Sequence, residues 1–269
     1  MAFLEAKNLW KQYGDSVILE DISVSVERGE FVTLVGTSGC GKSTFLRLLL
    51  GVENPTKGHL LMQGKAIADE PGPDRGIVFQ RYSVFPHLNV LDNLVLAEEF
   101  ERAKIVGRLF GKQKKMAREK ALQLLETVGL EHQLEKYPHQ LSGGMQQRLA
   151  IAQALMKKPL VLLLDEPFAA LDPGIRADMH EMMLNLWRET KLNIFMVTHD
   201  LREGFYLGSR LWVFDKDRVD PHKPHAFGSR ITYDIPVGHV ADAIYQEIEQ
   251  DVDSKRRELE RVEATHQHR

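Results

Sequence analysis

The feature of this sequence that most constrains its fold is the glycine-rich stretch GTSGCGKST at residues 36–44. It follows FVTLVG, a continuous apolar run typical of a buried strand, and it opens TFLRLLLGV, in which apolar residues have helical spacing. In such a strand, loop and helix, glycines let backbone N–H groups curl around phosphate oxygens. Lys42 would place a positive charge on the β and γ phosphates, and Ser43 would ligate magnesium. The stretch therefore predicts a nucleotide phosphate site at a helix start.

Other apolar runs indicate the fold class. VLLLD (161–165) and NIFMVTHD (193–200) are also typical of buried strands, and the stretch around MHEMMLNLWRET between them has helical spacing. Buried strands that alternate with helices predict an α/β fold with a mostly parallel, doubly wound sheet, whose ligands bind at the carboxyl ends of the strands. VILEDISVSV (17–26) instead alternates apolar and polar residues, which is typical of an antiparallel strand with one face in solvent.

Helical periodicity replaces these strand signals from about residue 81 to residue 155, as in MAREKALQLLETVGL, which Gly129 would end. We interpret residues 81–155 as a helical subdomain inserted into the core. Inside it, residues 102–120 carry eight basic residues against the single acid Glu119. This pattern is typical of a solvated helical surface, and it would also suit contact with anionic lipid headgroups or an acidic partner.

The chain changes character after Asp215. Residues 215–238 hold three prolines and several turn formers, which predicts irregular chain with room for one short strand. We therefore expect residues 216–269 to form a C-terminal extension that is irregular and then helical. The helical part is indicated by apolar residues at helical intervals, namely Ala241, Ile244, Tyr245, Ile248 and Val252.

Composition excludes some classes of function. A net charge of -3 argues against a protein that coats nucleic acid, so no nucleic-acid partner is expected. The single cysteine, Cys40, cannot form an internal disulfide. No apolar run reaches the roughly 18 residues that cross a bilayer, and MAFLEAKNLWKQYGD lacks the apolar stretch of a signal peptide. We expect a cytoplasmic chain that would reach a membrane only through a partner.

A second chemical signal is VLLLDEP, a strand that ends in two adjacent carboxylates. Asp165 is placed to hold magnesium through its water shell, and Glu166 could take a proton from an attacking water. Two acids at a strand end are also common in plain turns. Beside a phosphate loop, the catalytic interpretation is favoured.

Three further side chains border strand-like segments, and each has a structural alternative. Gln80 closes GIVFQ and would sense magnesium or the water, or it is a turn residue. His199 would hydrogen-bond the γ phosphate, or it caps a helix or fills the core. Tyr13 would stack its ring face on adenine, or it is a core aromatic.

LSGGMQQR, at residues 141–148, places two glycines, which lack side chains, at the start of a second helix, before LAIAQALM. Ser142 would cap this helix. The N–H groups of Gly143 and Gly144, together with the helix dipole, would face an anion. One nucleotide per chain does not need two separated anion sites, unless each chain lends its second site to a neighbour.

These motifs, in this order and with ALD (170–172) and THD (198–200), resemble the nucleotide-binding subunit of an ABC transporter over about residues 3–215. The resemblance implies an α/β P-loop NTPase fold of the ABC type across residues 1–215. Such a domain has an antiparallel β edge subdomain, a RecA-like, mostly parallel sheet as its core, and the inserted helical subdomain. It also implies ATP and Mg²⁺ as ligands.

The resemblance implies a role for each motif residue. Tyr13 is the adenine-stacking aromatic, residues 36–44 are the Walker A loop, and Asp165 with Glu166 is the Walker B pair. The implied catalytic residues are Glu166, the switch histidine His199 and the Q-loop residue Gln80. The implied metal ligands are Ser43, Gln80 and Asp165. The implied nucleotide-binding residues are Tyr13, Gly36, Thr37, Ser38, Gly39, Cys40, Gly41, Lys42, Ser43, Thr44, the signature residues Ser142, Gly143 and Gly144, and the D-loop residue Asp172.

A head-to-tail dimer is what the resemblance implies for the two anion sites. Each composite site would join the Walker A loop of one subunit to the signature of the other, and ATP would hold the subunits together until it is hydrolysed. The expected partners are a second copy of the chain, transmembrane permease subunits and, indirectly, a solute-binding protein. The expected location is peripheral, on the cytoplasmic face of the cell (inner) membrane.

RYSVFPHLNVLDNL and YPHQLSGGMQQRLAIAQAL most resemble importers for nitrate, sulfonates, taurine and related nitrogen or sulfur compounds, and SRITYDIPV is weakly similar to the tail of that branch. Two features depart from the pattern of that importer branch: the longer helical region near residues 102–118, and the sequence LREGFYLGSRLWVFDKDR after the switch histidine. Two alternatives stay open, a soluble ABC ATPase in cofactor assembly or another non-transport role, and an exporter subunit. DNA-repair ATPases carry a long coiled coil, whereas only about 100 residues separate Lys42 from Ser142.

Overall fold

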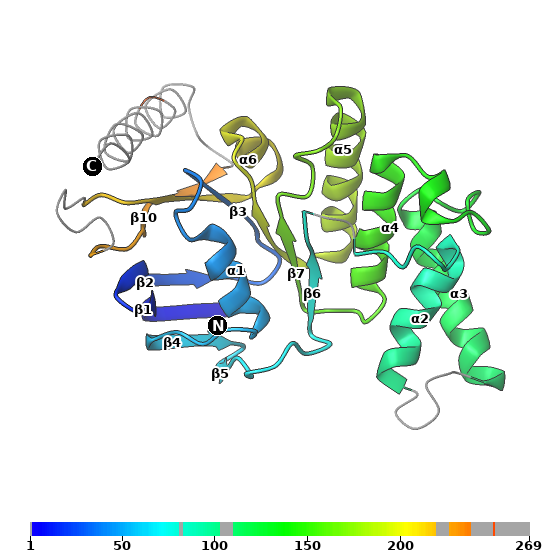
Figure 1. Ribbon diagram of the computed structural model, residues 1–269, viewed down its shortest axis with the longest axis horizontal. Coiled ribbons are helices and arrows are strands. Elements are labelled where there is room, and N and C mark those ends of the chain that lie inside the picture. The colour runs from blue at the N-terminus through cyan, green and yellow to red at the C-terminus, as the bar shows by residue number, and fades with distance from the viewer. Residues whose placement is uncertain (1, 81–82, 103–109, 219–225, 238–249, 251–269) are drawn as a thin grey trace. The chain divides into compact units, whose positions relative to one another are not determined.

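The computed structural model describes residues 2–80, 83–102, 110–218, 226–237 and 250 (Figure 1). The chain divides into two compact units. We name them by their place in the sequence: residues 1–71 and 195–269, from the two ends of the chain, form the outer unit, and residues 72–194, from the middle of the chain, form the central unit. The helix predicted from Ala241 onward and residues 103–109 of the basic stretch lie outside the described residues.

An antiparallel sheet forms one part of the outer unit. Its strand order is β2-β1-β4-β5, and β1 pairs antiparallel with both β2 and β4. Leu9, Leu19 and Ile22 are fully buried on its strands. The sheet confirms the antiparallel strand predicted from VILEDISVSV. The strands are β1 (Leu4–Tyr13), β2 (Ser16–Val26), β4 (Lys57–Met62) and β5 (Lys65–Ala66).

A second set of strands in the outer unit carries the glycine loop. β3 (Phe31–Gly36) is buried throughout and pairs parallel with β9 (Arg210–Asp215), which pairs antiparallel with β10 (Arg230–Pro236). The helix that follows the loop, α1 (Lys42–Leu50), places Phe45 against two rings of β9. The ring centroid of Phe45 lies 5.9 Å from that of Trp212 and 5.7 Å from that of Phe214. This packing fixes the position of α1 beside β3 and β9.

The first glycine of the loop has no room for a side chain. A Cβ on Gly36 would lie 2.1 Å from the carbonyl oxygen of Phe214, and φ of Gly36 is +146°. A Cβ on Gly39 would meet nothing within 4 Å, although its φ is +77°. Gly36 is therefore required by packing and by backbone conformation, and Gly39 by conformation alone.

This contrast gives a stability prediction. Gly36→Ala is expected to lower the free energy of unfolding by about 2–4 kcal/mol, because the added Cβ meets backbone that cannot move aside. Gly39→Ala, the matched control in the same loop, is expected to cost about 1 kcal/mol. Urea unfolding in the absence of nucleotide measures both values. Equal losses would contradict the close approach of Gly36 to β9.

A buried carboxylate ties the C-terminal extension to β2. Glu20 is 3% exposed and pairs with the guanidinium groups of Arg218 and Arg230, the second at 2.8 Å. The backbone N–H of Gly228 donates to the other oxygen of Glu20 at 3.0 Å. The N–H of Glu20 also donates to the carbonyl of Ser229 at 2.9 Å. We call these five residues the Glu20 latch.

Parallel pairing recurs in the central unit, where β6 (Arg75–Val78) pairs with β7 (Val161–Asp165). α5 (Pro173–Thr190) follows β7, and β8 (Asn193–Val197), which is buried throughout, runs across the boundary between the units. Strands and helices thus alternate as predicted, and the pairs β3–β9 and β6–β7 confirm parallel pairing.

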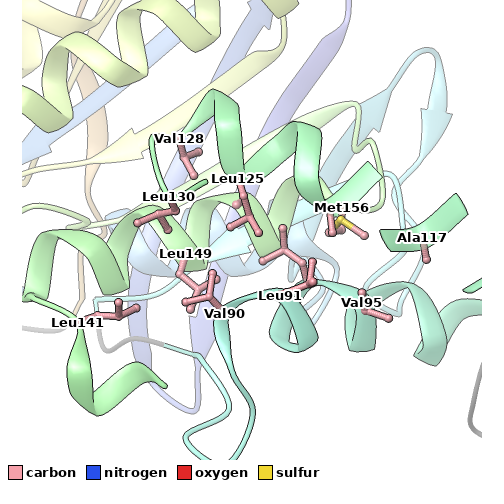
Figure 2. Close-up of a cluster of buried hydrophobic side chains, with 13 residues drawn as sticks. Val90, Leu91, Val95, Ala117, Leu125, Val128, Leu130, Leu141, Leu149 and Met156 are labelled. Atoms are coloured by element: carbon pink, nitrogen blue, oxygen red, sulfur yellow. The ribbon is translucent and has the colours of Figure 1, made fainter. Parts of the chain in front are cut away.

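Three helices of the central unit share one apolar core, and Figure 2 shows its labelled side chains gathered between them. Ala117, Ala121 and Leu125 repeat every four residues, so they form the buried face of one helix. That helix ends near Gly129, whose φ of +69° is left-handed and whose N–H donates to the carbonyl of Glu126 at 3.0 Å. The elements are α2 (Val90–Arg102), α3 (Gly111–Thr127), the 3-10 turn η1 (Pro138–Gln140) and α4 (Gly143–Leu155). Among the described residues, no helix is long and apolar enough to span a bilayer.

Candidate nucleotide-binding and hydrolysis site

The glycine loop turns sharply between β3 and α1. Gly36, Gly39 and Gly41 have φ values of +146°, +77° and +89°, a region that side chains disfavour. Gly41 directly precedes α1, and a Cβ there would lie 2.6 Å from Leu19 of β2. Ser38 and Gly39 at the tip are exposed. The loop thus presents backbone N–H groups at the start of a helix, which is the physical requirement for binding phosphate.

Lys42 lies beneath the loop rather than in solvent. Its side chain is 6% exposed, and its Nζ donates to the carbonyls of Gly36 at 2.8 Å and Thr37 at 2.9 Å. The sulfur of Cys40 lies 3.5 Å from the same nitrogen. Burial raises the pKa of the Cys40 thiol, against the opposing effect of Lys42, so the thiol stays protonated at neutral pH. Lys42 therefore holds the loop in shape and brings a buried positive charge to it.

Tyr13 ends β1 and keeps 43% of its surface exposed. Its hydroxyl donates to Glu53, and the ammonium of Lys11 lies 4.8 Å from its ring centroid. Burial, and then the hydrogen bond and charge of Glu53, raise the pKa of the Tyr13 phenol, against opposing effects of Arg47 and Thr44. Tyr13 thus lies near the end of the glycine loop with an accessible ring, not in the core.

His199 follows β8 on a short segment fixed at both sides. The hydroxyl of Thr198 donates to the buried carboxylate of Glu203 at 2.5 Å and accepts from the N–H of Asp200 at 3.1 Å. The carboxylate of Asp200 accepts from two N–H groups at the start of α6 (Leu201–Leu207). The backbone N–H of Thr198 donates to Leu34 of β3 at 3.1 Å. His199 is therefore an exposed side chain on backbone tied to the strand that precedes the loop.

The paired carboxylates lie in the central unit. Asp165 is the last residue of β7, and Glu166 follows it with a φ of +47°, a left-handed conformation rare outside glycine. Both side chains are half-buried. Gln80 lies two residues beyond β6, the strand that pairs with β7, and is exposed. The backbone strain at Glu166 is a feature that gathers at functional sites.

The signature turn begins α4. Ser142 caps the helix, because its Oγ accepts from the N–H of Met145 at 3.3 Å. Gly143 and Gly144 form the first turn, and a Cβ on Gly144 would lie 2.4 Å from Ile175. Ile175 is in the first turn of α5, which begins after Asp172. Asp172 is exposed and makes no side-chain cap bond with that helix. The glycine thus lets the start of α4 pack closely against the start of α5.

The predicted residues fall into two groups. The outer unit brings together Tyr13, the glycine loop and His199. The central unit holds Gln80, the signature turn, Asp165, Glu166 and Asp172. Among the described residues, no cluster of three or more His, Cys, Asp or Glu side chains is arranged to hold a metal ion. The proposed ligands Ser43, Gln80 and Asp165 instead offer hydroxyl, amide and carboxylate oxygens, the donor type that Mg²⁺ prefers.

Several residues that contact the candidate site belong to no sequence motif. Glu53 and Lys11 contact Tyr13, and Glu203 supports the segment of His199. Glu203 could have been found, because an Asp followed three residues later by a Glu is typical of a helix start. Glu53 lies 40 residues from Tyr13 in the sequence, so no local pattern reveals their contact.

Comparisons with known proteins give the family. The ABC transporter profile matches residues 19–169. The aliphatic sulfonates import ATP-binding protein SsuB of Bacillus anthracis is 38% identical over 218 residues, which cover 81% of this chain and 82% of the relative. The nitrate import ATP-binding protein NrtD of Synechococcus elongatus is 43% identical over 198 residues, which cover 74% of this chain and 69% of the relative.

Solved structures agree on the fold. The ADP conformation of an ATP-binding cassette of an ABC transporter aligns with a TM-score of 0.76 at 24% identity, over 93% of this chain and 96% of that chain. The sheets and helices described above match this P-loop fold with its antiparallel subdomain. The chain belongs to the ABC transporter family, as an ATP-binding subunit of the kind that hydrolyses ATP to power transport.

Proposed function

We propose that this chain energises the import of a small nitrogen or sulfur compound, such as nitrate, a sulfonate or a taurine-like solute. The observation that carries the proposal is a pair of separate glycine-containing helix starts on one chain, the glycine loop before α1 and the signature turn before α4, each of which would suit an anion. The names of the sulfonate and nitrate relatives support the class of solute.

The two helix starts act together in a head-to-tail dimer. One subunit contributes the glycine loop, and its partner contributes Ser142, Gly143 and Gly144, so two-fold symmetry creates two composite sites. Asp172 lies on the same packed pair of helix starts as Gly144, because Ile175 fills the space beside that glycine. A substitution at Asp172 would therefore act on the same dimer contact.

Within a composite site, each residue has one task. Lys42 and the loop N–H groups bind the phosphates, and Tyr13 stacks on adenine. Ser43, Gln80 and Asp165 would hold Mg²⁺, which neutralises phosphate charge when it is bound. Glu166 accepts the proton of the attacking water, and His199 hydrogen-bonds the γ phosphate. The hydrogen bonds of Thr198 and Asp200 hold the backbone on both sides of His199.

The partners of this chain follow from its proposed role in import. Transmembrane permease subunits convert closing and opening of the dimer into transport, and a solute-binding protein delivers the solute to them. The chain would then sit on the cytoplasmic face of the cell (inner) membrane. Copurification with a polytopic protein from detergent-solubilised membranes tests this assignment, and persistent recovery with a cytosolic scaffold would overturn it.

A mixing experiment tests the composite site. Lys42→Ala removes the loop lysine but leaves the signature intact, whereas Ser142→Arg blocks the signature but leaves the loop intact. Each variant alone is expected to be nearly inactive. An equimolar mixture is expected to recover about one quarter of wild-type ATPase activity, because half of the dimers are mixed and each has one intact site of two. A mixture no more active than its components would contradict a shared site.

A further inference from the structure

Tyr13 lies in a set of charged residues that no motif predicts. Its hydroxyl donates to Glu53, and the same carboxylate pairs with Lys11 at 3.1 Å and with Arg47 at 3.0 Å. Lys11 also donates to the carbonyl of Asn54 at 2.9 Å, and its side chain is only 12% exposed. Three chain segments, the end of β1, α1 and the loop after α1, therefore meet at one carboxylate.

The charge of Glu53 is what holds this set together. Burial would raise the pKa of its carboxyl, but hydrogen bonds from Tyr13, Lys11 and Arg47 lower it overall. Glu53 thus remains an anionic acceptor at neutral pH. The Tyr13 phenol, whose pKa is raised, remains a donor under the same conditions. Their hydrogen bond fixes the ring at its hydroxyl end.

One face of the ring is already occupied. The Lys11 ammonium lies 4.8 Å from the ring centroid, within the range of a cation–π contact. Because 43% of Tyr13 is exposed, the ring keeps accessible surface beyond the lysine. A flat ligand would therefore stack on the face opposite Lys11, and only if the ring keeps the angle that Glu53 and Lys11 set.

We propose that Lys11 and Glu53 are positioning residues that fix Tyr13 for stacking on the nucleobase, so that they set affinity for the base and not for the phosphates. This inference rests on the proposed function, in which Tyr13 is the base platform. A purely structural role for the same residues predicts something different. Loss of the contact among β1, α1 and the next loop would disturb the glycine loop as well, and phosphate binding would fall in parallel.

Two ligands separate these roles: ATP, and tripolyphosphate, which has the phosphates without the base. Calorimetry gives Kd for both ligands, and thermal melts check folding. Tyr13→Ala is expected to weaken ATP binding about 5- to 150-fold, the range of base–aromatic stacking, with tripolyphosphate changed less than about twofold. Glu53→Ala and Lys11→Met are expected to weaken ATP binding about 3- to 10-fold with the same selectivity.

Two further variants serve as controls. Glu53→Gln keeps an acceptor oxygen for Tyr13, so it should retain most of the preference for ATP over tripolyphosphate. Lys7→Met removes an exposed lysine from the same strand, whose pair with Glu5 at 2.8 Å does not involve Tyr13, and should change neither Kd. Rescue by Glu53→Gln in a chain that melts like wild type distinguishes ring positioning from a folding defect.

Each outcome has a distinct meaning. Selective loss of ATP affinity in Lys11→Met and Glu53→Ala supports the inference. Equal loss of both ligands, or no loss, in those variants while Tyr13→Ala remains selective would overturn the inference and leave the proposed function standing. If Tyr13→Ala itself affects both ligands equally, base stacking by Tyr13 is wrong, and the inference fails with that part of the proposed function.

Discussion

Glu166→Gln is expected to lower kcat for ATP hydrolysis by about 10²- to 10⁴-fold, the range for loss of a general base. Glutamine keeps the shape and the hydrogen-bonding reach of the side chain but cannot accept the proton of the attacking water. The backbone at this position is also strained, because Glu166 has a φ of +47° and precedes Pro167. Such strain costs about 1–3 kcal/mol, and it persists where surrounding structure imposes a particular placement on the residue.

The same variant should bind ATP as well as the wild type does, because in the proposed mechanism Glu166 would interact with the water and not with the phosphates. With hydrolysis blocked, ATP should hold two subunits together, and analytical ultracentrifugation in ATP should detect the dimer. Glu181→Gln changes an exposed glutamate on α5 and serves as the matched control, with kcat unchanged. Wild-type turnover by Glu166→Gln would refute its role as the base.

Lys42→Ala is expected to weaken ATP binding about 10- to 150-fold, which corresponds to the loss of a charge-assisted hydrogen bond of about 1.5–3 kcal/mol. The effect has two sources. The variant removes the positive charge that we propose binds the phosphates, and it leaves the carbonyls of Gly36 and Thr37 without the donor that now holds them. Isothermal calorimetry with a non-hydrolysed ATP analogue measures the affinity.

A folding control belongs with this measurement, because Lys42 is buried. Lys42→Met fills the same space without the charge, so its thermal melt shows how much stability depends on packing alone. If Lys42→Met melts near the wild-type temperature and still binds poorly, the charge is responsible. Undiminished ATP affinity in either variant would count against the glycine loop as the phosphate site.

The strands and helices that carry the site could be predicted because their signals are local. Continuous apolar runs gave β3, β7 and β8, and Gly129 marked the end of α3. The cap at Ser142 follows from one hydroxyl before an apolar helix. In each case the pattern and its structural cause lie within a few residues, so sequence reasoning reaches them.

Contacts between distant segments could not be predicted in this way. The neighbour that excludes a side chain at Gly144 is Ile175, which lies 31 positions later, and no spacing rule connects them. Glu53 looks like an ordinary loop acid until the fold brings Lys11, Tyr13 and Arg47 to it. Specific side-chain geometry of this kind depends on tertiary packing, not on periodicity.

The Glu20 latch has a consequence for where this protein can be cut. The resemblance to the family spans about residues 3–215 and so stops with β9, which makes residue 215 look like a natural expression boundary. A chain ending there would lack both arginines and the N–H that now surround the Glu20 carboxylate, which is 3% exposed, and it would also lack β10, the strand that pairs with β9. Leu19, the neighbour of Glu20, also borders Gly41. The lost contacts of Glu20 would therefore lie only one side chain away from the glycine loop. A boundary placed after β10 keeps the Glu20 latch intact.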